Sequence, residues 1–143
     1  MMNDELKITQ NSALSTQSSA LSTQNSIVER SFAFAVRVVK LCQFLEKQDR
    51  VSKTLANQLL RSGTSIGANV EEAQAGQSKA DFIAKMSIAR KEGRETHYWL
   101  RLLKEAGIVS DAQLSKIIKE AEEIIRILTA IVKTSQTRNS NNK

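Results

Sequence analysis

The chain has 143 residues, enough for one domain with a core of useful size. It contains no proline, 4% aromatic residues, one Cys and one His, and it carries a net charge of +6. This composition favours long helices over sheets, and it excludes an internal disulfide or a zinc site built from Cys and His. The positive charge suits an acidic partner such as nucleic acid, although it is also common on ordinary proteins.

The N-terminal region contains a tandem heptapeptide, NSALSTQ followed by SSALSTQ, over residues 11–24. Its Ser, Thr, Gln and Asn side chains bond to water or local backbone more readily than they hold a helix. We therefore predict a disordered tail over residues 1–25, with an amphipathic extension of the first helix, ordered only in an assembly, as the alternative. The first residues do not resemble a secretory signal.

Four helices are predicted over residues 26–135, and residues 136–143 are predicted to be a solvated tail. Each helix begins at a serine that can accept a hydrogen bond from a free backbone N–H of the first turn. Ala106-Gly107 is a stop signal, because Gly adopts the left-handed conformation that ends helices. The predicted helices are 26–47, 52–75, 78–104 and 110–135, with Ser26, Ser52, Ser78 and Ser110 as their caps.

Short loops make sequential helices antiparallel neighbours, so we predict an all-α, up-down-up-down four-helix bundle. The apolar residues of the first and third helices cover a wider arc than one partner helix needs. Copies of the chain are therefore expected to assemble. No apolar run approaches the roughly 18 residues that cross a bilayer, so we expect a cytoplasmic protein with no membrane contact.

The second helix contains an unusual run of small residues. Gly63 and Gly67 lie one turn apart on one face, and each interior Gly costs about 1 kcal/mol relative to Ala. That cost is tolerated where a neighbouring helix comes close. We predict a tight helix-packing seam made by Ser62, Gly63, Ile66, Gly67 and Val70.

Charged residues gather at the end of this seam and in the middle of the third helix. One interpretation is a solvated face with ordinary pairs along one helix. The other is partly buried charge pairing that fixes which helices meet. The residues assigned to this pairing are Glu71, Glu72, Arg90, Arg94 and Glu95.

A narrow basic strip follows the outer side of the first helix. Such a strip can follow a phosphate backbone, and each contact then adds salt-dependent affinity. The alternative is a surface that only keeps the protein soluble. No aromatic residue is interleaved, so binding would be indifferent to sequence. The candidate nucleic-acid-binding residues are Arg30, Arg37, Lys40 and Lys47.

The sequence shows no motif for an enzyme, a cofactor or a metal. The only His, His97, lies two residues after Glu95, which is not the Glu-x-x-His spacing of a di-metal bundle. No glycine-rich phosphate loop is present. Cys42 sits among apolar residues and is predicted to be a buried thiol, with a reactive thiol as the alternative.

Three segments together resemble a known family: residues 61–73 (RSGTSIGANVEEA), 76–82 (GQSKADF), and 88–92 (IARKE) with 98–100 (YWL). They resemble the four-helix-bundle proteins encoded in intervening sequences of bacterial 23S rRNA genes. The accessory variability protein of diversity-generating retroelements is related to that family. The resemblance covers residues 27–133 and implies a cytoplasmic homopentamer. For the retroelement member it also implies a basic surface that binds nucleic acid and a reverse transcriptase.

The leading hypothesis is a non-enzymatic homo-oligomer, expected to be a pentamer, that binds RNA or DNA through phosphates. It would act as an accessory factor of a ribonucleoprotein or a retroelement-like system. The alternative is an oligomeric protein-protein interaction scaffold with no nucleic-acid role.

Overall fold

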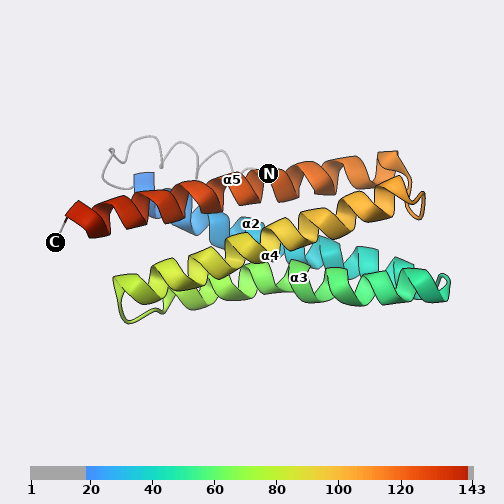
Figure 1. The fold of residues 1–143 in the computed structure, drawn as a ribbon, viewed down its shortest axis with the longest axis horizontal. Helices are drawn as coiled ribbons and strands as arrows, with labels where there is room; N and C mark the ends of the chain where they lie inside the picture. The colour runs from blue at the N-terminus through green and yellow to red at the C-terminus, as the bar shows by residue number, and fades with distance from the viewer. Residues whose placement is uncertain (1–18, 142–143) are drawn as a thin grey trace, which may run out of the picture.

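The computed structural model describes the backbone of residues 19–141 and the side chains of residues 26–138. The described chain is all-α, without strands, and forms four long helices (Figure 1). These are α2 (Ser19–Glu46), α3 (Arg50–Gln74), α4 (Lys79–Glu105) and α5 (Asp111–Asn141). Three short connections join them, as the prediction of four helices linked by short loops required.

Two of the predicted helix starts and the predicted stop are confirmed. Ser78 Oγ accepts the N–H of Asp81 at the start of α4, and Ser110 Oγ accepts the N–H of Gln113 at the start of α5. Gly107 ends the α4 region with a positive φ of 71°, a conformation that costs glycine nothing because it has no Cβ.

The predicted caps at Ser26 and Ser52 are wrong. Ser26 lies inside α2, which begins seven residues earlier, at Ser19. Nothing between them stops a helix, since no Gly or Pro intervenes and extending an existing helix needs no new nucleus. Asp49 caps α3 by accepting the N–H of Ser52 at 2.8 Å, so Ser52 itself lies in the first turn and is buried.

The predicted tails also differ from the structure where it describes them. Residues 19–25 of the heptapeptide region are helical, and α5 continues through Asn141 rather than ending at Ser135. Most of the predicted N-terminal tail, residues 1–18, lies outside the described residues.

The helices surround one apolar core. Its largest fully buried side chains come from all four elements and include Phe34, Leu59, Leu100 and Ile124. Among the described residues, each helix packs closely on the next in sequence and α2 and α5 pack less closely, while no Cα atom of α2 comes within 8 Å of α4, nor any of α3 within 8 Å of α5. The α2–α3 side of the molecule therefore lies opposite the α4–α5 side.

All five seam residues are buried where α3 meets its neighbours. A Cβ at Gly67 would lie 3.2 Å from the carbonyl oxygen of Ser31, and one at Gly63 would lie 2.7 Å from a methyl of Val38. Gly67 thus allows the α2 backbone to approach α3, and Gly63 allows the branched side chain of Val38 to do so. Ser65 bonds to the helix itself, since its hydroxyl donates to the carbonyl of Arg61 at 2.6 Å.

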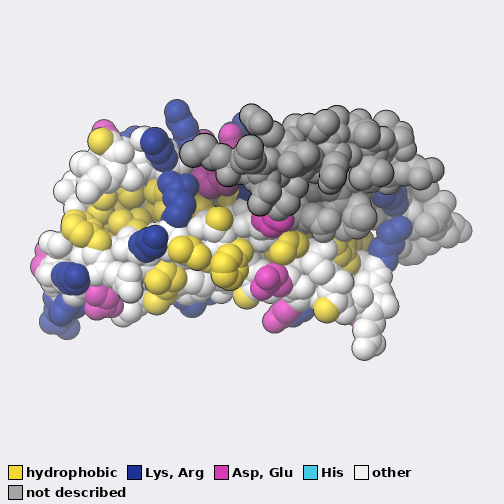
Figure 2. Space-filling model, turned by 180° about the vertical axis from the view of Figure 1, so that it is seen from behind, with side chains coloured by type: hydrophobic (Ala, Val, Ile, Leu, Met, Phe, Trp, Pro, Cys, Tyr) yellow, Lys and Arg dark blue, Asp and Glu magenta, His cyan; other side chains and the backbone are white. Residues whose placement is uncertain are grey.

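One face of the molecule keeps an exposed row of apolar side chains. Phe32, Val36 and Val39 of α2 are spaced i, i+4, i+7 and so share one stripe, and Leu60 of α3 lies on the side of its helix that faces α2. We call these four residues the apolar ridge. Phe32 is 62% exposed. Figure 2 views the molecule from the side on which α2 lies and shows hydrophobic side chains crossing this face.

Candidate nucleic-acid interface

The basic strip of α2 retains three free cations. Arg37, Lys40 and Lys47 are exposed, and none of them forms an ion pair with any residue in the described part of the chain. All three therefore present their charge to solvent, where a phosphate can reach it.

Arg30, the fourth residue of the strip, has a different environment. Its Nε and Nη2 donate to the two carboxylate oxygens of Glu120, each at 3.0 Å, and Nη2 also contacts Glu123. These bonds, Glu120 first, raise the pKa of Arg30 above its ordinary value. Arg30 thus joins α2 to α5 at the looser helix pair of the bundle, and its charge is already neutralised.

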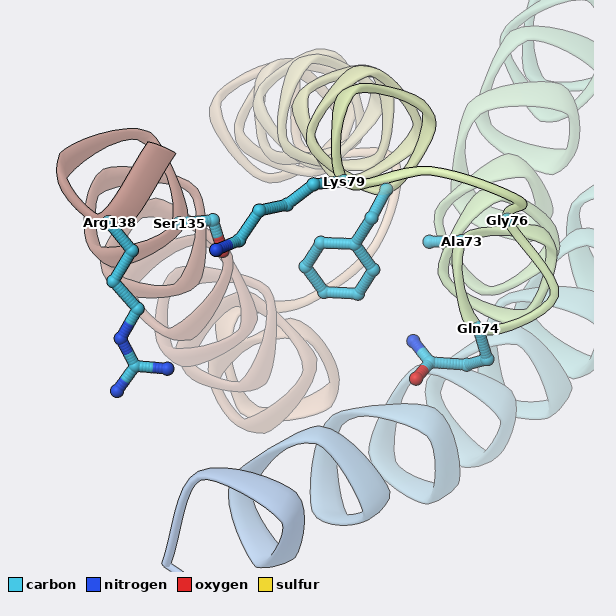
Figure 3. A pocket seen from close by; sticks show the side chains of 7 residues that line it. Ala73, Gln74, Gly76, Lys79, Ser135 and Arg138 are labelled. Atoms are coloured by element: carbon cyan, nitrogen blue, oxygen red, sulfur yellow. The ribbon is translucent and has the colours of Figure 1, made fainter. Parts of the chain in front are cut away.

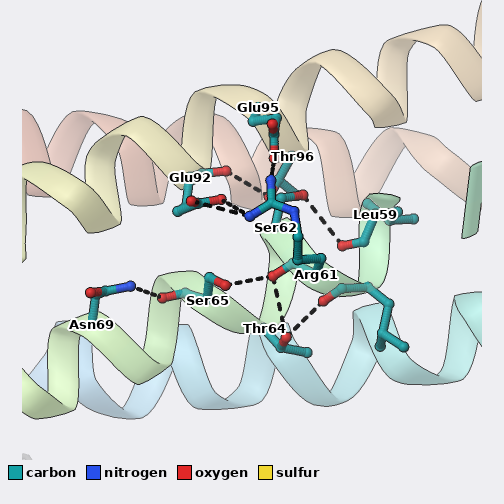
Figure 4. Close-up of polar contacts among 10 residues, drawn as sticks. Leu59, Arg61, Ser62, Thr64, Ser65, Asn69, Glu92, Glu95 and Thr96 are labelled. Atoms are coloured by element: carbon teal, nitrogen blue, oxygen red, sulfur yellow. Dashed lines mark hydrogen bonds and ion pairs between the residues drawn. The ribbon is translucent and has the colours of Figure 1, made fainter. Parts of the chain in front are cut away.

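The predicted charge pairing among Glu71, Glu72, Arg90, Arg94 and Glu95 is wrong in its partners, although Glu72 and Glu95 do form ion pairs between α3 and α4. Glu72 binds Lys85 at 2.8 Å, and Arg61 of α3 binds Glu95 and, at 3.3 Å, Glu92 (Figure 4). The remaining three residues, Glu71, Arg90 and Arg94, form no ion pair within the described residues, and Glu71 and Arg94 are exposed.

The register of α3 against α4 explains the difference. Thr96 Oγ1 lies 3.0 Å from Ser62 Oγ, which places the preceding Arg61 beside Glu92 and Glu95 (Figure 4). Because the two helices are antiparallel, Glu72 falls at the level of Met86, one residue from Lys85, which it binds. One partly buried pair does exist, since the side chain of Glu92 is only 16% exposed, but its cation is Arg61.

A second basic surface lies along the seam between α4 and α5, and sequence reasoning missed it. His97 Nε2 lies 3.1 Å from Glu122 Oε1, which marks where the two helices face each other. On each helix, cations lie three residues before and four residues after this pair, which places them on the same side of the helix as His97 and Glu122. One more cation on each helix lies further along the same side. We call them the α4–α5 basic face: Arg90, Arg94 and Arg101 of α4, and Lys119, Arg126 and Lys133 of α5.

None of these six cations is ion-paired within residues 26–138, and all except the half-buried Arg90 are exposed. Glu122, the carboxylate among them, is already bound to His97, and the acidic residues Glu105 and Asp111 stand at the loop end of the seam. A sequence signal was available, since Lys119, Arg126 and Lys133 recur every seven residues. That signal shows a stripe on one helix, but only the helix register shows that Arg94 and Arg101 lie beside it.

The site's chemistry is that of phosphate contact. Arg and Lys bind phosphate oxygens without reading the base sequence.

Residues 26–138 bring together no group of three or more His, Cys, Asp or Glu side chains that could hold a metal. Burial, with a smaller effect of Glu46, raises the pKa of the Cys42 thiol to about 11, so this thiol is protonated near neutral pH and is a poor nucleophile. No helix in the described range is long and apolar enough to span a bilayer.

The molecule is thus an all-α bundle of four packed helices, with basic surfaces along two of its sides. The chain belongs to the 23S rRNA-intervening sequence protein family, whose model matches residues 23–130. A similar solved structure is a protein of unknown function from the S23 ribosomal protein family of Bacteroides thetaiotaomicron. It is 43% identical, covers 78% of this chain and 98% of its own, and has a TM-score of 0.72. No curated protein matches the chain.

Proposed function

We propose that this protein is a non-enzymatic bundle of up-down-up-down topology that assembles with copies of itself, as a pentameric ring, and binds RNA or DNA through phosphates. The observation that carries the proposal is the α4–α5 basic face, where six cations lie together without neutralising partners. Two adjacent helices supply them, so their charges add along a surface rather than along a single helix.

The apolar ridge supports the self-assembly part of the proposal. It lies on the α2–α3 side, opposite the α4–α5 basic face, so a contact between copies through the ridge leaves the basic face open. The ridge contains no charge, and in a head-to-tail ring it would pack on a different apolar surface of the next copy. We propose further that the ring acts as a cytoplasmic accessory factor of a ribonucleoprotein or retroelement-like system and contacts a reverse transcriptase, as the resemblance to the retroelement protein implies.

The test is nucleic-acid affinity measured against salt concentration. For a single strand, the slope of log affinity against log salt is about −0.7 for each phosphate contact. Replacing Arg94, Arg101 and Arg126 with Gln should therefore flatten the slope by about 2 units per bound subunit. Replacing Arg37, Lys40 and Lys47 with Gln tests the α2 strip in the same way.

A matched control is the double variant Arg50→Gln/Lys53→Gln. Both residues are exposed cations at the start of α3, without ion pairs in the described structure, and neither belongs to either basic surface, although Arg50 follows Lys47 of the α2 strip by three residues. This variant should leave the slope almost unchanged. Absence of binding at low salt, or equal losses in all three variants, would reject the phosphate-binding proposal and favour the protein-protein scaffold.

A further inference from the structure

A hollow of about 240 Å³ lies at one end of the bundle, where α3 ends, α4 begins and the last turns of α5 pass by (Figure 3). It is separate from both basic surfaces described above. Three helices contribute to its walls, so its shape depends on the packed bundle and not on one loop. The lining residues that matter for its chemistry are Gln74, Gly76, Lys79, Phe82, Ser135 and Arg138.

Two cations from different helices line this hollow. Lys79 comes from the first turn of α4, and its side chain reaches toward Ser135 in Figure 3, while Arg138 extends from the end of α5 in a different direction. Neither is ion-paired within the described residues, and no carboxylate is among the lining residues. Two positive charges that line one hollow, with no carboxylate among its lining residues, favour an anionic ligand, since desolvation by the ligand strengthens the attraction.

The rest of the lining adds an aromatic surface and hydrogen-bonding groups. Phe82 is half-buried and packs on the core, so its ring is held in place while one side lines the hollow. Gln74 donates from Nε2 to the carbonyl of Val70 at 2.9 Å, which leaves Oε1 as an acceptor. Ser135 adds a hydroxyl beside Lys79 (Figure 3). Gly76 contributes no side chain, so the wall beside the ring stays open.

An aromatic ring beside paired cations is the combination that binds nucleotides, because a base stacks on the ring while the cations hold the phosphate. The hollow is smaller than pockets for drug-sized ligands, so it would hold no more than one such unit. A terminal phosphate carries a charge of about −1.5 to −2 near neutral pH, as phosphomonoesters do, against −1 for an internal diester. Two cations match the terminal group better.

We propose that the hollow lined by Lys79, Phe82 and Arg138 binds a nucleotide that bears a terminal phosphate. This site deepens the proposed function, on which it rests, because it would let a bundle that otherwise ignores sequence distinguish the end of a strand from its interior. The same chemistry is presented by a phosphorylated strand end and by a free nucleoside monophosphate.

The experiment measures the affinity of the full-length protein for one single-stranded oligonucleotide in three forms: with a 5′-phosphate, with a 3′-phosphate, and with hydroxyls at both ends. We expect at least one phosphorylated form to bind about tenfold more tightly than the hydroxyl form. Adenosine monophosphate and inorganic phosphate serve as competitors. Displacement of the phosphorylated strand by the monophosphate at micromolar concentration would indicate the free nucleotide as the ligand, and resistance to it would indicate the strand end.

Three variants test which residues cause the preference for a phosphorylated end. Lys79→Gln/Arg138→Gln should abolish the preference for a phosphorylated end while leaving affinity for the hydroxyl form almost unchanged. Phe82→Leu keeps apolar volume against the core but removes the ring, and should reduce the preference severalfold. The control Arg50→Gln/Lys53→Gln removes two charges at the opposite end of α3 and should keep the preference. Circular dichroism confirms that each variant is folded.

Equal affinity for all three oligonucleotides would overturn the terminal-phosphate site, while salt-dependent binding of the hydroxyl form would leave the proposed function standing. A preference that survives in Lys79→Gln/Arg138→Gln would also overturn it. Failure of every oligonucleotide to bind at low salt, with the monophosphate also inert, would reject both proposals together.

Discussion

At Gly63 the absence of a side chain decides how closely α2 and α3 pack. An added Cβ would lie 2.7 and 2.9 Å from the two γ-methyls of Val38, and a β-branched side chain in a helix has one strongly preferred rotamer and cannot turn away. Gly63→Ala gains about 1 kcal/mol of helix propensity, but overpacking typically costs about 1–3 kcal/mol. We expect a net loss of stability on the order of 1 kcal/mol, measured by urea unfolding.

The control for this prediction is the same substitution with Val38 already shortened to alanine. Removing the methyls removes the two contacts shorter than 3.0 Å and leaves only the Cβ of residue 38, at 3.2 Å, so Gly63→Ala in that background should no longer destabilise the fold and should stabilise it by up to about 1 kcal/mol. Equal effects in the two backgrounds would mean that close approach to Val38 is not the reason for the glycine.

At the scale of the helices, the start of α3 is a pH-sensitive feature. The backbone hydrogen bond from Ser52, with a second bond from its side chain, lowers the pKa of Asp49. A carboxyl whose pKa is lowered by folding stabilises the fold above its unfolded pKa, about 3.9. That contribution is lost as the pH falls through the lower, folded-state value.

We therefore expect the wild-type protein to lose more stability between about pH 6 and about pH 3 than the variant Asp49→Asn, which can still cap but does not titrate. Asp49→Ala should be less stable than both at neutral pH, because it removes the cap. Urea midpoints measured across this range check the prediction. Parallel pH curves for the wild type and Asp49→Asn would contradict it.

The helix ends also show which features could be predicted from the sequence. It found Ser78, Ser110 and Gly107 because a cap depends on residues within one turn of it. It missed Asp49 because the preceding residues read as an undivided polar break. It missed the start of α2 because no residue marks it; a polar repeat without Gly or Pro is compatible with both a tail and a helix.

Contacts between helices were less predictable than the helices themselves. Arg30 looked like part of a free strip, and only the approach of α5 shows that Glu120 and Glu123 bind it. Arg90 and Arg94 were assigned carboxylate partners that the α3–α4 register gives to Arg61 and Lys85. A single-helix pattern identifies which side a residue occupies, but the level at which two helices meet depends on the packing of the whole core.

At the scale of the whole molecule, the two unusual surfaces lie on opposite sides. The apolar ridge is on the α2–α3 side and the α4–α5 basic face is on the other, so neither hides the other. Basic faces on several joined copies would act on one nucleic-acid strand together, and the effective concentration of the second contact would raise affinity without any new interaction. Self-assembly and phosphate binding are thus physically coupled in the proposed function.

This coupling gives the last prediction. Val36→Gln/Val39→Gln should separate the copies into single chains of 15.9 kDa, because both side chains are exposed in one chain and contribute to the ridge. The fold should survive, since polar surface substitutions usually change stability by less than about 0.5 kcal/mol. Light scattering on the purified protein measures the mass, which for a wild-type pentamer is about five times that of one chain.

The matched control is Val51→Gln, which makes the same change at a side chain that is 60% exposed but lies at the start of α3, away from the ridge. It should leave the assembly intact.

The separated double variant should also bind nucleic acid more weakly and with a flatter salt dependence, although it keeps all six cations of the α4–α5 basic face. The reason is that each strand then meets one copy of that face at a time. A wild-type protein that is a single chain at micromolar concentration would contradict the assembly, and an unchanged salt slope in the separated variant would show that the copies do not bind a strand jointly.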